Sequence, residues 1–118
     1  MPVLILDRST QVADRLSDLV AEVKKEIAIY KAASDKAAIK LLDKIMPAAV
    51  LLDVDFSGNS AIAILKKIKQ KNDKTVVIVL HNHTDERELK LYKVIGADYI
   101  FNKYDDFEKI PAIISAIQ

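Results

Sequence analysis

Four short apolar runs in this 118-residue chain are each followed by a side chain that could do acid–base, metal or phosphate chemistry. These side chains are Asp7, Asp53, His81 and Lys103, and Arg8 directly follows Asp7. The runs are rich in Val, Ile and Leu, which is typical of buried parallel strands. Since the carboxyl ends of parallel strands share one edge of a sheet, where ligands bind, we predict a single site containing these five residues.

The segments between the runs have apolar residues at helical spacing, so strands and helices alternate along the chain. The alternation is typical of an α/β fold built from repeated strand–helix units. We expect strands over residues 3–6, 27–31, 50–53, 76–80 and 99–102, and helices over 12–23, 35–45, 61–68, 84–94 and 105–117.

Polar side chains and two special residues mark the expected helix ends. Gly96 follows the fourth helix, where a left-handed residue commonly ends a helix. Pro111 has no backbone donor, so the last helix can restart there with proline at its first position. The expected N-caps are Ser9 or Thr10, Ser34 or Asp35, Thr84, and Asp105 in a capping box with Glu108.

Composition narrows the classes of protein that fit. A length of 118 residues with 51% hydrophobic content predicts one domain over residues 1–118 with a proper core. The 18 basic and 17 acidic residues nearly cancel, which favours neither direct nucleic-acid binding nor membrane binding. There is no cysteine, no signal-type N-terminus and no stretch of 18 apolar residues, so we expect a soluble, cytoplasmic protein.

The chain resembles the receiver domain of two-component response regulators in three pieces taken together: residues 4–7, residues 50–53, and residues 96–99 leading to Lys103. The resemblance implies a doubly wound, flavodoxin-like α/β fold. Its parallel sheet would have five strands in the order 2-1-3-4-5, with five helices on both faces. It also implies a signalling module rather than an enzyme.

The resemblance further implies the role of each site residue. Asp53 would accept a phosphoryl group from a histidine kinase or phosphotransfer protein, and Lys103 would pair with the phosphoryl oxygens. Asp7, Asp53 and the backbone carbonyl of Asp55 would hold Mg²⁺. The residue types agree with these roles, because two facing carboxylates repel and need a dication or an ammonium group between them. The alternative for Asp53 is a strand-end aspartate that caps the following turn.

Arg8 departs from the family pattern, which has a second acid there that ligates the metal. A guanidinium about 6 Å from a dication costs about 3 kcal/mol relative to a carboxylate, even with water-like screening. We therefore expect weak Mg²⁺ binding. Arg8 could instead turn to solvent, the Asp55 side chain could supply the missing oxygen, or Arg8 could take the role of the metal by pairing with Asp53 or a phosphate.

Two further departures affect the residues that convert phosphorylation into movement in the family. His81 stands where the family has a Thr or Ser hydroxyl. The interpretation without a functional role is a structural histidine at the end of a strand, hydrogen-bonded to the backbone. A transition-metal triad of Asp7, Asp53 and His81 is the less favoured alternative. Ile100 replaces the usual switch aromatic, and alternation places its neighbours Tyr99 and Phe101 on the other face.

Three functions remain in order of preference. The first is a phosphorelay receiver that signals to a downstream protein, with the fourth helix, fifth strand and last helix as the contact surface and homodimerisation possible. The second is a pseudo-receiver that binds partners without phosphorylation. The third, a flavodoxin-like nucleotide or flavin binder, lacks a phosphate-binding loop, since residues 8–11 contain no glycine.

Overall fold

The apolar runs form the five parallel strands of one sheet in the order β2-β1-β3-β4-β5, which confirms the predicted topology. A computed structural model describes residues 1–58 and 60–117. The second strand lies one residue later than predicted, and β4 extends to His81. The strands are β1 (Pro2–Leu6), β2 (Ala28–Ala32), β3 (Ala49–Asp53), β4 (Val76–His81) and β5 (Tyr99–Asn102).

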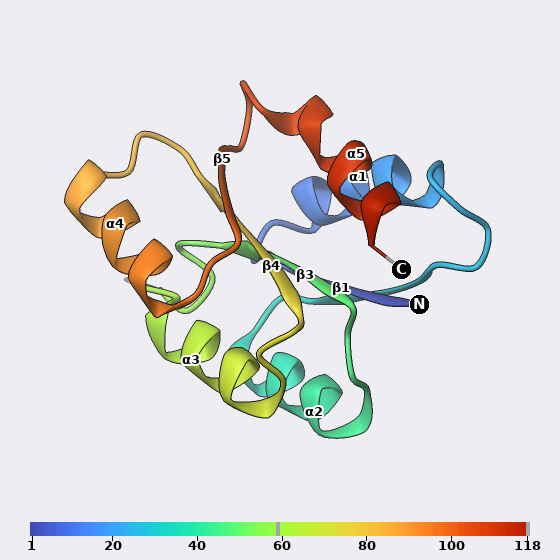
Figure 1. Ribbon diagram of the computed structural model, residues 1–118, viewed down its shortest axis with the longest axis horizontal. Helices are drawn as coiled ribbons and strands as arrows, with labels where there is room; N and C mark the ends of the chain where they lie inside the picture. The colour runs from blue at the N-terminus through green and yellow to red at the C-terminus, as the bar shows by residue number, and fades with distance from the viewer. Residues whose placement is uncertain (59, 118) are drawn as a thin grey trace.

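Helices cover both faces of this sheet (Figure 1). The helices are α1 (Thr10–Ala21), α2 (Asp35–Lys44), α3 (Ile62–Lys71), α4 (Glu86–Ile95) and α5 (Ile110–Ala116), with a 3₁₀ turn over Phe107–Lys109. Helices α1 and α5 pack on one face, and α2, α3 and α4 cover the other face. The described helices are all too short or too polar to cross a membrane.

Two hydrophobic layers fill the space between the sheet and the helices because the strand side chains alternate between the faces. Leu4, Leu52 and Val79 face α2, α3 and α4, whereas Ile5 and Leu51 face α1 and α5. These five side chains are at most 1% exposed. Along β3, residues that face α2, α3 and α4 alternate with residues that face α1 and α5, and all of them are buried. The central strand is therefore a rigid base for Asp53 at its end.

The helix starts follow the predicted chemistry at two places and differ at a third. The hydroxyls of Ser9 and Ser34 accept hydrogen bonds from backbone N–H groups in the first turns of α1 and α2. The prediction of Thr84 as the cap of α4 is wrong. Asp85 is the cap instead, and its carboxylate accepts a hydrogen bond from the Arg87 N–H at 2.7 Å.

The start of the last helix also differs from the predicted capping box. Asp105 makes no cap bond there, and a 3₁₀ turn over 107–109 precedes α5. The carboxylate of Asp106 instead accepts a hydrogen bond from the Asn102 N–H at 2.8 Å, which closes the turn after β5. Pro111 is the second residue of α5, one position later than predicted, and the missing donor still costs no hydrogen bond in this first turn.

Tyr92 of α4 ties the loop after β3 to the helix layer. Its side chain is 1% exposed, and its hydroxyl accepts a hydrogen bond from the Ala61 N–H at 2.8 Å. The same hydroxyl donates to the Val54 carbonyl at 3.4 Å. Ala61 begins α3 without a side-chain cap, so Tyr92 satisfies a donor that the local sequence leaves open.

We expect Tyr92→Phe to lower the free energy of unfolding by about 1–2 kcal/mol, because the buried Ala61 N–H loses its acceptor. Urea unfolding followed by circular dichroism measures this change. Tyr104→Phe is the matched control, since Tyr104 is 60% exposed. Equal effects of the two substitutions would show that the hydroxyl of Tyr92 does not stabilise the loop.

Candidate functional site

The Lys103 ammonium lies between two buried carboxylates at the carboxyl edge of the sheet. Its Nζ is 2.7 Å from Asp7 Oδ2 and 3.1 Å from Asp53 Oδ1. Asp7 and Asp53 are 3% and 8% exposed, and the Lys103 side chain is 11% exposed. The structure therefore brings together these three residues as the sequence predicted, and the ammonium offsets the repulsion between the acids.

Sheet register explains why these side chains meet. Leu6 of β1 pairs with Leu52 of β3, so the next residues along the two strands are Asp7 and Asp53. Asp7 is held by the backbone, since its N–H donates to Ala32 O at 3.2 Å. The backbone N–H of Ser9 donates to Asp7 Oδ1 at 2.8 Å, which orients Oδ2 toward Lys103.

Lys103 reaches this pair from the far side of the sheet. It follows β5, and its backbone N–H donates to the carbonyl of His81 at 2.7 Å, which continues the β4–β5 ladder. This bond fixes the backbone of Lys103, and so the start of its side chain, beside the end of β4. The ammonium therefore reaches past β4 to the ends of β1 and β3.

Burial and ion pairing shift the pKa values of two of these groups. Burial raises the pKa of Asp53, the Lys103 ammonium partly opposes this rise, and the charges of Asp7 and Asp55 add to it. For Lys103, burial lowers the pKa, but the bonds to Asp7 and Asp53 outweigh burial and raise it. Lys103 is thus held in its charged form, while Asp53 is a more basic carboxylate than an exposed aspartate.

The loop after β3 places the Asp55 backbone beside the site. The Phe56 N–H donates to the Asp53 carbonyl at 3.0 Å, and the Gly58 N–H donates to the Asp55 carbonyl at 3.1 Å. The backbone of Asp53 closes the turn, and its carboxylate is left for Lys103. Gly58 has a φ of +84°, a left-handed conformation that favours glycine.

Arg8 lies at the mouth of the site. The side chain is exposed and forms no ion pair with the carboxylates of the described residues. Its Nη1 would be 4.0 Å from a Cβ placed on Gly58, so the guanidinium extends toward the loop that follows Asp53. The Arg8 side chain is thus exposed to solvent and still close to the edge of the sheet that carries Asp53.

The donor set does not fit a tightly bound Mg²⁺. Asp7 Oδ2 has no hydrogen-bond partner besides its ion pair with Lys103 among the described residues, so one buried oxygen could face a cation. Lys103 already occupies the space between the acids, and the residue after Asp7 is Arg8, a cation that offers no oxygen ligand. Within residues 1–58 and 60–117, no three carboxylate or imidazole side chains gather as a metal centre.

His81 and Ile100 lie next to the site on β4 and β5. The Nδ1 atom of His81 is buried and has no hydrogen-bond partner in the described part of the chain. Nδ1 therefore does not make the hydrogen bond to the backbone that a purely structural histidine was expected to make. Ile100 packs on the layer of α2, α3 and α4, and Phe101 packs on the opposite layer, as strand alternation predicted.

Two residues near the site were not singled out from the sequence. The hydroxyl of Tyr92 fixes the loop after Asp53, but a tyrosine on an apolar helix stripe carries no signal for such a bond. Asp106 lies near His81, and its bonds to Lys109 and to the Asn102 backbone lower its pKa. The sequence feature that could have indicated this bond is the spacing of four residues between Asn102 and Asp106.

Comparisons with known proteins give relatives along most of the chain. The sensory transduction protein LytT of Bacillus subtilis (strain 168) is 30% identical over 104 residues, covering 88% of this chain and 43% of LytT. The chain thus spans less than half the length of this curated relative.

Solved structures share the fold. The signal receiver domain of a DNA-binding response regulator from Colwellia psychrerythraea 34H has a TM-score of 0.87 at 22% identity, covering 97% of this chain and 94% of that one. The beryllofluoride-activated NtrC4 receiver domain dimer has a TM-score of 0.83 at 21% identity, covering 96% and 92%.

The family model described as the response regulator receiver domain matches residues 3–115. This match includes Asp7, Asp53 and Lys103, the three residues that the fold brings together. The family is a signalling module of two-component systems rather than a classical enzyme, and its members typically use Mg²⁺. The chain therefore belongs to the response regulator receiver domain family.

Proposed function

We propose that residues 1–118 act as one receiver domain of a cytoplasmic phosphorelay, with Asp53 as the acceptor of a phosphoryl group. The donor is a histidine kinase or a phosphotransfer protein. The observation that carries this proposal is the Lys103 Nζ between Asp7 Oδ2 and Asp53 Oδ1, at 2.7 and 3.1 Å. An ammonium in this place is ready to pair with the oxygens of a phosphoryl group on Asp53.

The chemistry needs a nucleophile and a way to offset negative charge. An oxygen of the Asp53 carboxylate attacks phosphorus, the bond from phosphorus to the donor nitrogen breaks, and the donor imidazole leaves with the electron pair. Burial supports this role because it raises the pKa of the Asp53 carboxyl and makes the oxygen more basic. Mg²⁺ binds only weakly to oxygens of Asp7, Asp53 and Asp55, since Arg8 repels it.

A pseudo-receiver that binds partners without phosphorylation is the second candidate. Lys103 already pairs with both buried acids and offsets one of their two negative charges without any ligand. The residues that transmit phosphorylation in the family are also replaced here by His81 and Ile100. Both observations are compatible with a module whose contacts do not depend on a phosphoryl group.

The contact surface for a downstream protein or a second copy is α4, β5 and α5 in either case. Leu91 and Val94 of α4 are 48% and 82% exposed, and Tyr99 of β5 is 38% exposed. A groove beside Ile100 is bordered by the α4 residues Glu86, Leu89, Lys90 and Lys93. Exposed apolar side chains with flanking charges are typical of protein–protein contacts.

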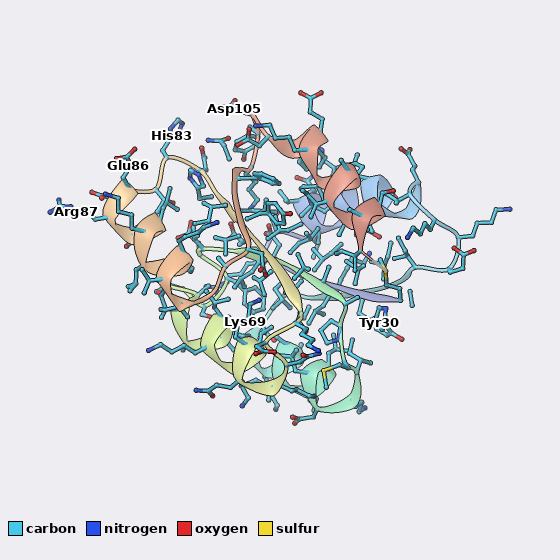
Figure 2. The ribbon with its side chains drawn as sticks, viewed as in Figure 1. Tyr30, Lys69, His83, Glu86, Arg87 and Asp105 are labelled. Atoms are coloured by element: carbon cyan, nitrogen blue, oxygen red, sulfur yellow. The ribbon has the colours of Figure 1, made fainter. Side chains whose placement is uncertain are left out.

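Acetyl phosphate with Mg²⁺ should label the protein once, at Asp53, as an acyl phosphate that hydroxylamine removes. Intact mass spectrometry measures the label, and Asp53→Asn should abolish it. Asp105→Asn is the control, because Asp105 is an exposed carboxylate on the turn after β5 (Figure 2). Label that survives Asp53→Asn would contradict the assignment, and absence of label would favour the pseudo-receiver.

Arg8→Asp should tighten Mg²⁺ binding about a hundredfold, since replacing repulsion by attraction changes the binding free energy by about 3 kcal/mol in total. The wild-type dissociation constant should be millimolar or weaker, and titration followed by amide chemical shifts measures both. Equal affinities for the two proteins would show that the guanidinium of Arg8 does not act on the cation.

Beryllofluoride bound at Asp53 should change amide chemical shifts close to the site and leave α4 and β5 nearly unchanged. A ligand moves an equilibrium only through its different affinities for two states, and His81 and Ile100 offer no second arrangement of a hydroxyl and an aromatic ring. The control is the double variant His81→Thr with Ile100→Tyr, whose changes should extend to α4 and β5. Large wild-type changes there would overturn this expectation.

A further inference from the structure

The replacement of an acid by Arg8 has the same electrostatic effect on the site as a divalent cation. A guanidinium in place of a carboxylate makes the local charge more positive by two units, as a bound dication does. The two negative charges of Asp7 and Asp53 are therefore matched by Arg8 and Lys103 alone. The two buried acids therefore need no metal ion to balance their charge before a phosphoryl group arrives, and the third carboxylate near Asp53, that of Asp55, is exposed to solvent.

The position of Arg8 in the structure supports its taking the place of a cation. The pairing of Leu6 with Leu52 sets Asp7 beside Asp53, and Arg8 is the next residue along the chain. The guanidinium reaches toward Gly58 in the loop that follows Asp53, and it forms no ion pair with a described carboxylate. A phosphoryl group on Asp53 would thus lie between Lys103, on the β5 side, and Arg8, on the side of β1 and the loop.

The chemistry of the two cations is suited to these places. Lys103 is a point charge that is already bonded to Asp53 Oδ1. Arg8 presents a planar fork of donors that pairs with two phosphate oxygens at once, and it stays charged at any working pH. Its exposure leaves the fork free to turn toward the carboxylate edge, while the nearly buried Lys103 ammonium does not move away.

We propose that Asp53 accepts a phosphoryl group without a divalent metal ion, with the Arg8 guanidinium and the Lys103 ammonium holding the phosphoryl oxygens. This inference rests on the proposed role of Asp53 as phosphoacceptor. With phosphoramidate as donor, an Asp53 oxygen forms the new bond to phosphorus and the P–N bond breaks. Ammonia leaves with the electron pair, because the nitrogen of phosphoramidate is already protonated.

Phosphorylation by phosphoramidate in EDTA, compared with the same reaction in Mg²⁺, tests the proposal. The wild-type protein should be labelled at the same rate in both, as measured by intact mass. Arg8→Gln keeps the length of the side chain but removes its charge, and should slow labelling in EDTA about a hundredfold. Arg87→Gln is the matched control, since Arg87 is on the outer end of α4 and points away from the molecule (Figure 2).

Arg8→Asp provides the converse experiment because it restores an acid at this position. Its labelling should be lost in EDTA and return with millimolar Mg²⁺. A second measurement does not depend on reaction: inorganic phosphate, added in EDTA, should shift the amide signals of Asp53 and Lys103 in the wild-type protein. These shifts should be absent in Arg8→Gln, with an unchanged circular dichroism spectrum as the check of folding.

The outcomes separate the two proposals. Wild-type labelling that requires Mg²⁺ would overturn metal-free phosphorylation and leave Asp53 as the acceptor. Equal labelling of wild type and Arg8→Gln in EDTA would overturn the role of Arg8. Absence of label in both EDTA and Mg²⁺ would overturn the acceptor function, and the inference that rests on it.

Discussion

The site depends on one constraint, which is that two carboxylates are buried side by side and must be neutralised. Asp7 and Asp53 are nearly buried at the ends of adjacent strands, and Lys103 crosses from β5 to contact both. Removing one partner of a buried pair is costly because it leaves the other charge uncompensated. The ion pair therefore fixes the positions of three chain segments that are far apart in sequence.

The remaining structure holds these segments in place. Leu52 and its neighbours on β3 bury both faces of the central strand, so Asp53 emerges from rigid backbone. Tyr92 extends this order to the following loop through its bonds to Val54 and Ala61. Gly58 supplies a left-handed residue in the loop before α3. The two acids are therefore held by rigid backbone, whereas the nearby Arg8 side chain is exposed.

In the proposed function, binding an anion and transmitting a change are separate properties, and different residues serve them. Arg8 and Lys103 bear on the first because they supply positive charge at the carboxyl edge. His81 and Ile100 bear on the second because they lie between that edge and α4. A chain can keep one set and alter the other: the proposed function keeps Asp53 as the acceptor and Lys103 as the cation, whereas His81 and Ile100 stand in place of the transmitting residues.

The sequence by itself determined the α/β class, the helix stripes and the edge at which Asp7, Asp53 and Lys103 meet, because these follow from local periodicity and from strands that end together. The contacts of single side chains were decided only by the tertiary structure. The bridging position of Lys103, the hydroxyl of Tyr92 and the approach of Arg8 to Gly58 join residues far apart in the chain. No local pattern encodes such distances, since they depend on how strands and loops pack. The choice of Asp85 over Thr84 as a cap likewise rests on the path of the β4–α4 loop.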